Sequence, residues 1–283
     1  MADYAHPETL VTTDWVKQNL GKPGVKVAEI DVDTKAYDAG HIRGAVGLNW
    51  QTQLQDQVNR DIIGREGFER LVGGAGISPQ DTVILYGDNN NWFAAYGFWL
   101  FKLYGHRDVR LMNGGRVKWL NEPDKELTTD RPDVKPAPYK VTEEHPEYRS
   151  MVTEVLENIK GHRVNLVDVR SPDEFTGKVI APPGMSETAQ RGGHIPGAKG
   201  IPWSTAVNAD GTFKSADELR SIYVQQNGVD PNKDSIAYCR IGERSSHTWF
   251  VLKYLLGFTN VKNYDGSWTE YGNLVAAPIE KAV

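Results

Sequence analysis

The sequence is poor in cysteine, because Cys239 is the only thiol among 283 residues. A chain with one cysteine forms no internal disulfide, and it lacks the Cys-x-x-Cys pair of a dithiol redox enzyme. A long apolar run is also missing, so we expect no membrane span. Residues 1–9 have neither a basic start nor an apolar stretch, so we expect no signal peptide. Together these absences predict a cytoplasmic protein.

An excess of positive charge is missing as well, because the net charge is −5 at pH 7. This balance argues against general nucleic-acid binding, which depends on neutralising phosphates. Hydrophobic residues make up 39% and charged residues 24%, which is typical of a globular protein. The length leaves room for two domains of ordinary size.

The two halves of the chain repeat one another. Residues 40–45 (GHIRGA) match residues 193–198 (GHIPGA), and residues 81–86 (DTVILY) match residues 234–239 (DSIAYC) at the same interval. Three shorter agreements occur in the same order: residues 30–32 (IDV) match 167–169 (VDV), 103–105 (LYG) match 255–257 (LLG), and 113–114 (NG) match 265–266 (DG). Five ordered agreements indicate a duplicated domain rather than a short-period solenoid.

Each half has the pattern of an α/β domain. Short apolar runs predict buried strands over residues 25–32, 82–86, 163–169 and 235–239. Helices are expected over residues 92–104 and 248–256, each followed by a glycine stop. Alternating strands and helices predict parallel sheets flanked by helices. Prolines among charged residues predict an extended linker over residues 128–148, between domains at 1–127 and 149–283.

The segment around Cys239 carries the clearest signal of chemistry. We expect a strand to end at Cys239 and a helix to begin near Ser245 or Ser246, with a short loop between them. Backbone N–H groups of such a loop converge on one point, with a helix N-terminus behind them. This cradle is expected to lower the thiol pKa without a metal, because it favours the nucleophilic thiolate. Gly242 permits the tight backbone path.

The two arginines near the thiol predict an anionic substrate, since guanidinium groups bind anions well. Arg244 is placed to hold an anion in two-point contact, whereas Arg240 is expected to point outward. A lone cysteine after a strand is commonly a small buried hydrophobe. The charged residues that follow Cys239 are a poor core sequence, however, and favour a catalytic thiol.

Residues 239–244 (CRIGER) resemble the six-residue active loop of the rhodanese family. The paired GHI-x-GA segments resemble that family's early signature, and DGSW at 265–268 resembles its late one. The resemblance covers nearly the whole chain and implies two tandem rhodanese-like domains, of which the N-terminal one is inactive. It implies thiosulfate:cyanide sulfurtransferase activity through a persulfide on Cys239, without metal or cofactor.

The resemblance also implies the partners and the site. The donor is a small anionic sulfur compound, the acceptor is cyanide or a thiol, and the loop amides stabilise the persulfide. The substrate contacts are expected from Arg240, Ile241, Gly242, Glu243 and Arg244.

The donor is indicated by the residues around the thiol. A basic residue after the cysteine, here Arg240, resembles the thiosulfate-preferring members, whereas mercaptopyruvate-preferring relatives tend to have Cys-Gly-Ser-Gly. Two positions depart from the animal thiosulfate enzymes, because Ile241 stands where they have Lys and Glu174 where they have a second Arg. Arg244 resembles the substrate-binding arginine of bacterial members. 3-Mercaptopyruvate is therefore the alternative donor.

Several other residues of these motifs are expected to serve the scaffold. We assign no chemistry to His41 and His194, and we expect Asp31 and Asp168 to tie loop ends. Trp92 and Phe93 are expected in the core rather than in a pocket. In the first half, residues 86–88 (YGD) occupy the place of the thiol, so that half lacks the nucleophile.

Two rival classes remain at this stage. A cysteine phosphatase of related fold has Cys-x5-Arg, whereas Cys239 and Arg244 give the shorter Cys-x4-Arg. The smaller loop suits a sulfur atom better than a phosphoryl group. A rhodanese-fold binding module without turnover is the rival outside the enzymes.

Overall fold

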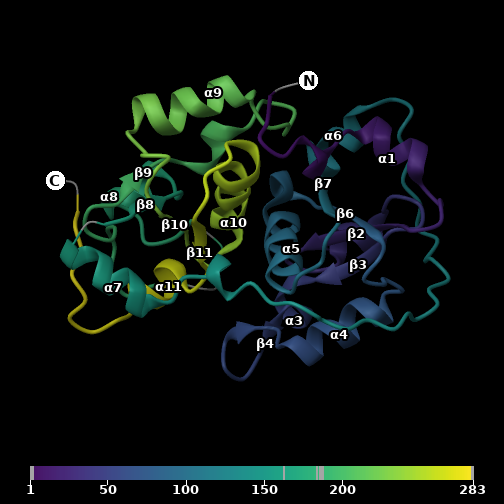
Figure 1. The fold of residues 1–283 in the computed structure, drawn as a ribbon, viewed down its shortest axis with the longest axis horizontal. Helices are drawn as coiled ribbons and strands as arrows, with labels where there is room; N and C mark the ends of the chain where they lie inside the picture. Colours follow the sequence, from purple (N-terminus) through teal and green to yellow (C-terminus); the bar gives the residue numbers. More distant parts are fainter. Residues whose placement is uncertain (1–2, 162, 183, 185–187, 282–283) are drawn as a thin grey trace. The chain divides into compact units, whose positions relative to one another are not determined.

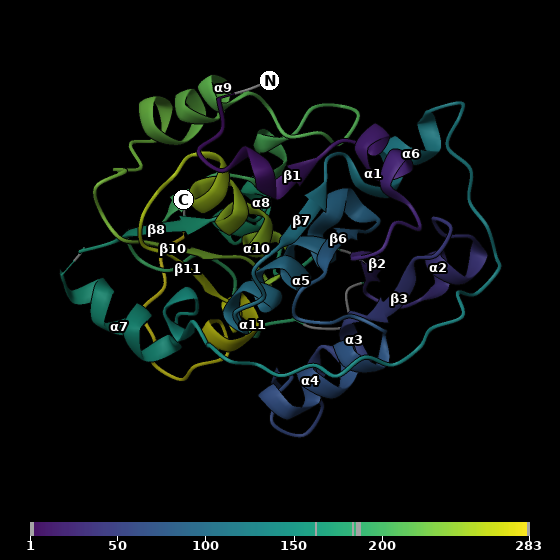
Figure 2. The ribbon, with the colours of Figure 1, turned by 45° about the vertical axis from the view of Figure 1, so that its right-hand side comes forward.

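The computed structural model describes residues 3–161, 163–182, 184 and 188–281, and Figures 1 and 2 show its ribbon. The chain divides into two compact units. One comprises Glu8–His145 and Asn208–Phe213, and the other comprises the rest of the chain. In the described part, no helix combines the length and apolar character needed to cross a membrane. The expected domain boundaries at residues 127 and 149 stay predictions.

The unit that contains Glu8–His145 is built on a parallel sheet with the strand order β1-β7-β6-β2-β3. Its strands are β1 (Leu10–Val11), β2 (Val25–Asp31), β3 (Val46–Asn49), β6 (Thr82–Tyr86) and β7 (Val109–Met112), with β4 (Gln55–Asp56) and β5 (Asp61–Ile62) forming a separate antiparallel pair. Its helices are α1 (Thr13–Asn19), α2 (Lys35–Ala39), α3 (Trp50–Gln53), α4 (Arg65–Gly74), α5 (Trp92–Leu103) and α6 (Gly115–Asn121).

The second unit repeats this plan on a parallel sheet with the strand order β11-β10-β8-β9. Its strands are β8 (Asn165–Asp168), β9 (Lys199–Gly200), β10 (Ser235–Tyr238) and β11 (Val261–Tyr264). Its helices are α7 (Val152–Gly161), α8 (Pro172–Thr176), α9 (Ala216–Arg220), α10 (Glu243–Phe250) and α11 (Ser267–Tyr271), of which α9 and α10 continue as wider π-type turns over Ser221–Gln226 and Val251–Leu255. The α/β prediction and the duplication are confirmed.

Burial on both faces explains why the sheets are parallel and apolar. All four residues of β8 and of β10 are buried, as are the last five residues of β2. Such strands are stable only when helices cover both faces of the sheet. In Figure 1, α5 packs on β2, β6 and β7, and α10 packs on β10 and β11. Helix α5 is buried almost all round, which suits a core helix.

Residues 129–145, which lie in the segment expected to be a linker, contain neither helix nor strand. This segment runs along α4, where the backbone N–H of Ala137 donates to the carbonyl of Gly73 and that of Val141 to Glu69. One short segment from the second half of the chain packs in the first unit. Asn208–Phe213 belongs to the first unit, where Asp210 pairs with Lys118 at 2.9 Å.

Candidate active site

Cys239 lies directly after β10, at the carboxyl edge of the parallel sheet, where α/β proteins place their sites. Its side chain is fully buried. The strand position was predicted correctly, but the helix begins at Glu243 rather than near Ser245 or Ser246. The expected start at residue 248 was therefore also too late. Glu243 and Arg244 consequently belong to the first turn of α10 instead of to the loop.

Gly242 makes this early start possible. Its φ of 102° lies in the left-handed region, which strains any residue with a side chain. An added Cβ would also lie 2.9 Å from the Cβ of Asp265. The turn directs the Gly242 N–H to the sulfur of Cys239, at 3.1 Å from Sγ. This contact is one backbone N–H of the cradle that the sequence predicted.

Hydrogen bonds of the Cys239 backbone fix the loop to the segment after β11. The N–H of Cys239 donates to Ser267 Oγ at 3.0 Å, and the N–H of Trp268 donates to the Cys239 carbonyl at 3.1 Å. Hydroxyls also approach the sulfur, with Ser245 Oγ at 3.6 Å and Ser267 Oγ at 3.9 Å from Sγ. Sequence reasoning missed these two serines, although the DGSW motif pointed to Ser267.

The environment of the thiol differs from the expected one in its charge. The thiol of Cys239 donates a hydrogen bond to Glu243 Oε2 at 3.2 Å. Burial, followed by the negative charge of Glu243, raises the pKa of Cys239 above its ordinary value, although Arg244 and Ser245 act in the opposite direction. The expectation of a lowered thiol pKa was wrong, because it counted the amides and arginines but neither the burial nor the adjacent carboxylate.

Arg244 makes a two-point contact with a carboxylate of its own unit. Its Nη1 and Nη2 donate to the two oxygens of Glu174 at 2.9 and 3.0 Å, and both side chains are buried. Glu174 is also the third residue of the capping box that begins α8, with Ser171 at the N-cap. Glu174, which departs from the animal enzymes, and Arg244, in the first turn of α10, thus form one ion pair.

The other two predicted contact residues are buried. Arg240 was expected to point outward, but its side chain is only 8% exposed and its Nη2 lies 3.9 Å from Glu243 Oε1. The expectation treated it as a surface charge, whereas the buried Glu243 attracts it inward. Ile241 is also buried. The structure therefore gathers Cys239, Gly242, Glu243, Arg244 and Arg240 around one loop.

The counterpart of the thiol in the other unit is a glycine. Tyr86 and Tyr238 both accept a hydrogen bond from the backbone of a GHI motif, at 2.9 and 3.1 Å, so these two tyrosines correspond. Gly87 therefore corresponds to Cys239, and the constant interval that paired Tyr86 with Cys239 was wrong by one residue. A Cβ at Gly87 would lie 2.4 Å from the Ile30 carbonyl oxygen, so the backbone leaves no room for a thiol.

The histidines of the two GHI motifs contact backbone carbonyl groups of the scaffold. His41 Nδ1 contacts the Tyr37 carbonyl oxygen, and His194 Nδ1 contacts that of Phe175, at 2.9 and 2.8 Å. Phe93 is in the core beside Trp50, with the ring centres 5.1 Å apart, whereas Trp92 is only partly buried, so the core prediction was wrong for Trp92.

The aspartates also hold loops in place. Asp31 Oδ1 accepts the Asp88 N–H at 2.7 Å, and Asp168 accepts the backbone and guanidinium N–H groups of Arg170.

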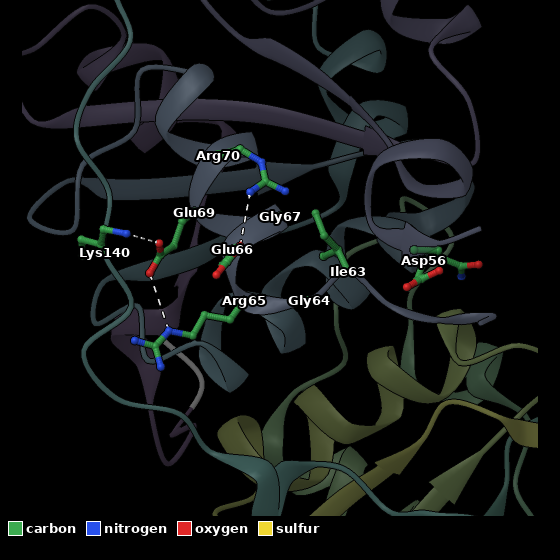
Figure 3. A pocket seen from close by; sticks show the side chains of 10 residues that line it. Asp56, Ile63, Gly64, Arg65, Glu66, Gly67, Glu69, Arg70 and Lys140 are labelled. Carbon is green, nitrogen blue, oxygen red and sulfur yellow. Dashed lines mark hydrogen bonds and ion pairs between the residues drawn. The ribbon is translucent and has the colours of Figure 1, made fainter. Parts of the chain in front are cut away.

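A hollow of about 690 Å³ lies beside the start of α4 (Figure 3). Its charged side chains pair with one another, since Lys140 Nζ lies 2.6 Å and Arg65 Nε 3.7 Å from Glu69, and Arg70 lies 3.7 Å from Glu66. Neither a thiol nor a histidine is among the residues that line it. Within the described residues, no group of three His, Cys, Asp or Glu is placed to hold a metal ion.

Comparison with known proteins identifies the fold and the family. The rhodanese-like domain model matches residues 12–122 and 151–274. A protein of Saccharopolyspora erythraea named "Putative thiosulfate sulfurtransferase" is 60% identical over 96% of both chains. The "Sulfur carrier protein TtuD" of Thermus thermophilus is 55% identical over 98% of both chains. The crystal structure of an anaerobic ergothioneine biosynthesis enzyme from Chlorobium limicola matches with a TM-score of 0.85, at 25% identity, over 100% of this chain and 72% of its own.

Proposed function

Because this chain belongs to the rhodanese family, we propose that it is a sulfurtransferase that carries sulfur as a persulfide on Cys239. The observation that carries this proposal is the position of the only thiol, at the carboxyl edge of the sheet with the Gly242 N–H 3.1 Å from its sulfur. A buried N–H directed at a sulfur stabilises negative charge on that sulfur.

In the proposed reaction, the Cys239 thiolate attacks the outer sulfur of thiosulfate. A bond forms between the two sulfurs, the bond from the outer sulfur to the sulfonate breaks, and sulfite leaves with the electron pair. Cyanide or a thiol then attacks the outer sulfur of the persulfide, which releases thiocyanate or a new persulfide and restores the thiolate. The name of the Thermus relative, a sulfur carrier protein, favours a thiol as the acceptor.

We propose that Arg240, Ile241, Gly242, Glu243 and Arg244 form the donor site. Thiosulfate is supported by Arg240 and by the name of the Saccharopolyspora relative. A second donor, 3-mercaptopyruvate, is favoured by one specific contact. Glu174 accepts hydrogen bonds from both terminal nitrogens of Arg244 and so reduces the positive field at the site. This reduction weakens the binding of thiosulfate, a dianion, more than that of 3-mercaptopyruvate, which carries one carboxylate.

The test is the mass of the intact protein. Incubation with thiosulfate should add one sulfur atom, cyanide should remove it, and Cys239→Ser should fold and take up none. Turnover with thiosulfate and with 3-mercaptopyruvate, measured in parallel, identifies the donor. Sulfur uptake by Cys239→Ser would rule out the persulfide mechanism, and a wild-type thiol that takes up no sulfur from either donor would leave a binding module without turnover.

A further inference from the structure

The contact between Cys239 and Glu243 has no role in the reaction as described so far. We propose that Glu243 is the proton acceptor of the Cys239 thiol, and this inference rests on the proposed sulfurtransferase function. The Cys239 Sγ lies 3.2 Å from Glu243 Oε2, so the thiol can donate its proton directly to the carboxylate. Hydrogen-bond reach of the proton is the first requirement for a general base.

The carboxylate of Glu243 is oriented by two cations. Its Oε1 lies 3.6 Å from Arg244 Nε and 3.9 Å from Arg240 Nη2. Both arginines therefore act on one oxygen, and Oε2 faces the sulfur. The two guanidinium groups fix the direction of this buried carboxylate.

A proton acceptor is needed because the thiol is shielded from bulk water. Cys239 is fully buried, and Glu243 is 2% exposed. Burial and the Glu243 charge raise the pKa of the Cys239 thiol, so the resting form at neutral pH is the thiol. The thiol is a poor nucleophile until its proton leaves. Transfer to Glu243 forms the thiolate without bringing in hydroxide.

The proton transfer leaves the whole reaction balanced. The thiol proton moves to Glu243, the thiolate attacks the outer sulfur of thiosulfate, and the S–S bond to the sulfonate breaks. The departing sulfite takes the proton from Glu243 and leaves as hydrogen sulfite, so the carboxylate is restored. The protonated Glu243 carries no charge while the dianion is bound, which removes one source of repulsion at that step.

Other charged groups face this pair from neighbouring elements, and most of them are matched. Arg244 is bound by Glu174 of α8, and Asp265, after β11, is bound by Arg149 at 2.7 Å. At the end of β8, Asp168 is bound by Arg170 at 2.6 Å. These pairs contribute opposed charges, and the largest effect of any charge on the Cys239 thiol is that of the Glu243 carboxylate.

The experiment measures the alkylation rate of Cys239 by iodoacetamide between pH 5 and 10, in the full-length protein. Iodoacetamide is uncharged, and Cys239 is the only thiol. In the wild type, attack assisted by the Glu243 carboxylate does not need hydroxide, so the rate should be nearly flat from about pH 6 to 8. In Glu243→Gln, the rate should rise about tenfold per pH unit over that range. At pH 6 it should fall below the wild-type rate by about tenfold or more, because losing a general base outweighs the thiolate gained when a negative charge is removed.

Glu243→Asp is the matched control, because it keeps the charge and withdraws the carboxylate by about 1.5 Å. If the contact between the carboxylate and the sulfur is required, the alkylation rate of Glu243→Asp should depend on pH as that of Glu243→Gln does. A Glu243→Gln rate above the wild type at every pH, with the same slope, would show that Glu243 only repels the thiolate and would overturn the proposal. A wild-type rate without a flat region would overturn it too, even if neither variant folds. Loss of sulfur uptake with the flat region intact would instead refute the proposed function.

Discussion

The ion pair between Arg244 and Glu174 allows a prediction that separates stability from substrate binding. The side chains of Arg244 and Glu174 are 6% and 0% exposed, and their two hydrogen bonds measure 2.9 and 3.0 Å. Removal of one partner from a buried ion pair leaves the other charge uncompensated, at a cost of roughly 3–5 kcal/mol. We therefore expect Arg244→Met to lower the free energy of unfolding of its unit by about that amount.

The double variant Arg244→Met with Glu174→Gln is the control. Gln keeps the capping box with Ser171 but carries no charge, so the double variant should recover at least half of the lost free energy. Burial by itself would raise the pKa of Glu174, but the hydrogen bonds and charge of Arg244 hold it below its ordinary value. The stability that the pair supplies is thus present above the unfolded-state pKa of Glu, and it is lost as the pH falls through the folded-state pKa.

The assay is urea unfolding followed by pulse labelling of Cys239. The thiol is fully buried, so its reactivity reports the unfolding of its own unit rather than of the whole chain. A cost below about 1 kcal/mol for Arg244→Met would refute the reasoning, since exposed pairs contribute that little. A double variant no more stable than Arg244→Met would refute it as well. A loss of thiosulfate turnover in Arg244→Met should be attributed to substrate binding only if the double variant, once its stability has recovered, remains inactive.

Two further predictions concern the unit without a thiol. Gly87→Cys should destabilise that unit, because its Cβ would lie 2.4 Å from the Ile30 carbonyl oxygen. In a Cys239→Ser background, the intact mass of Gly87→Cys should show no sulfur taken up from thiosulfate. Sulfur uptake by a stably folded variant would contradict the steric argument. Burial and the charge of Asp88 raise the pKa of Asp31 to about 9, so the folded protein keeps a proton that the unfolded chain releases. The contribution of Asp31 to stability should therefore fall as the pH rises from about 4 to 9, and the urea midpoint of Asp31→Asn relative to the wild type should rise with pH; a constant difference would contradict the shift.

The sequence was sufficient for the features that depend on local pattern. The duplicated motifs, the buried strands and a thiol at the end of β10 follow from apolar runs and spacing. The start of α10 was not predicted, because it depends on the left-handed φ of Gly242. An error of a few residues there hid the consequence that Glu243 faces the sulfur.

Contacts between distant residues were beyond the sequence. Glu174 and Arg244 are separated by 70 positions, and nothing in either motif indicates that they form an ion pair. The correspondence of Gly87 with Cys239 depends on strand register, in which Tyr86 lies opposite Glu29 and Tyr238 opposite Asp168. A single extra residue in one strand is enough to shift a match made at constant interval.

The segment Asn208–Phe213 has a consequence for the order in which the chain folds during synthesis. The N–H of Phe213 donates to Asn113 Oδ1 at 2.9 Å, and Asp210 pairs with Lys118, so these residues complete a unit that otherwise ends at His145. Domains generally fold from the N-terminus as the ribosome releases them. Here the last segment of the first unit is synthesised more than sixty residues after His145. By then β8 and β9 of the other unit have already been synthesised, so the first unit is complete only after them. Synthesis of the second unit therefore begins before the first unit is complete. A chain that ends between the two halves lacks Asn208–Phe213 of the first unit.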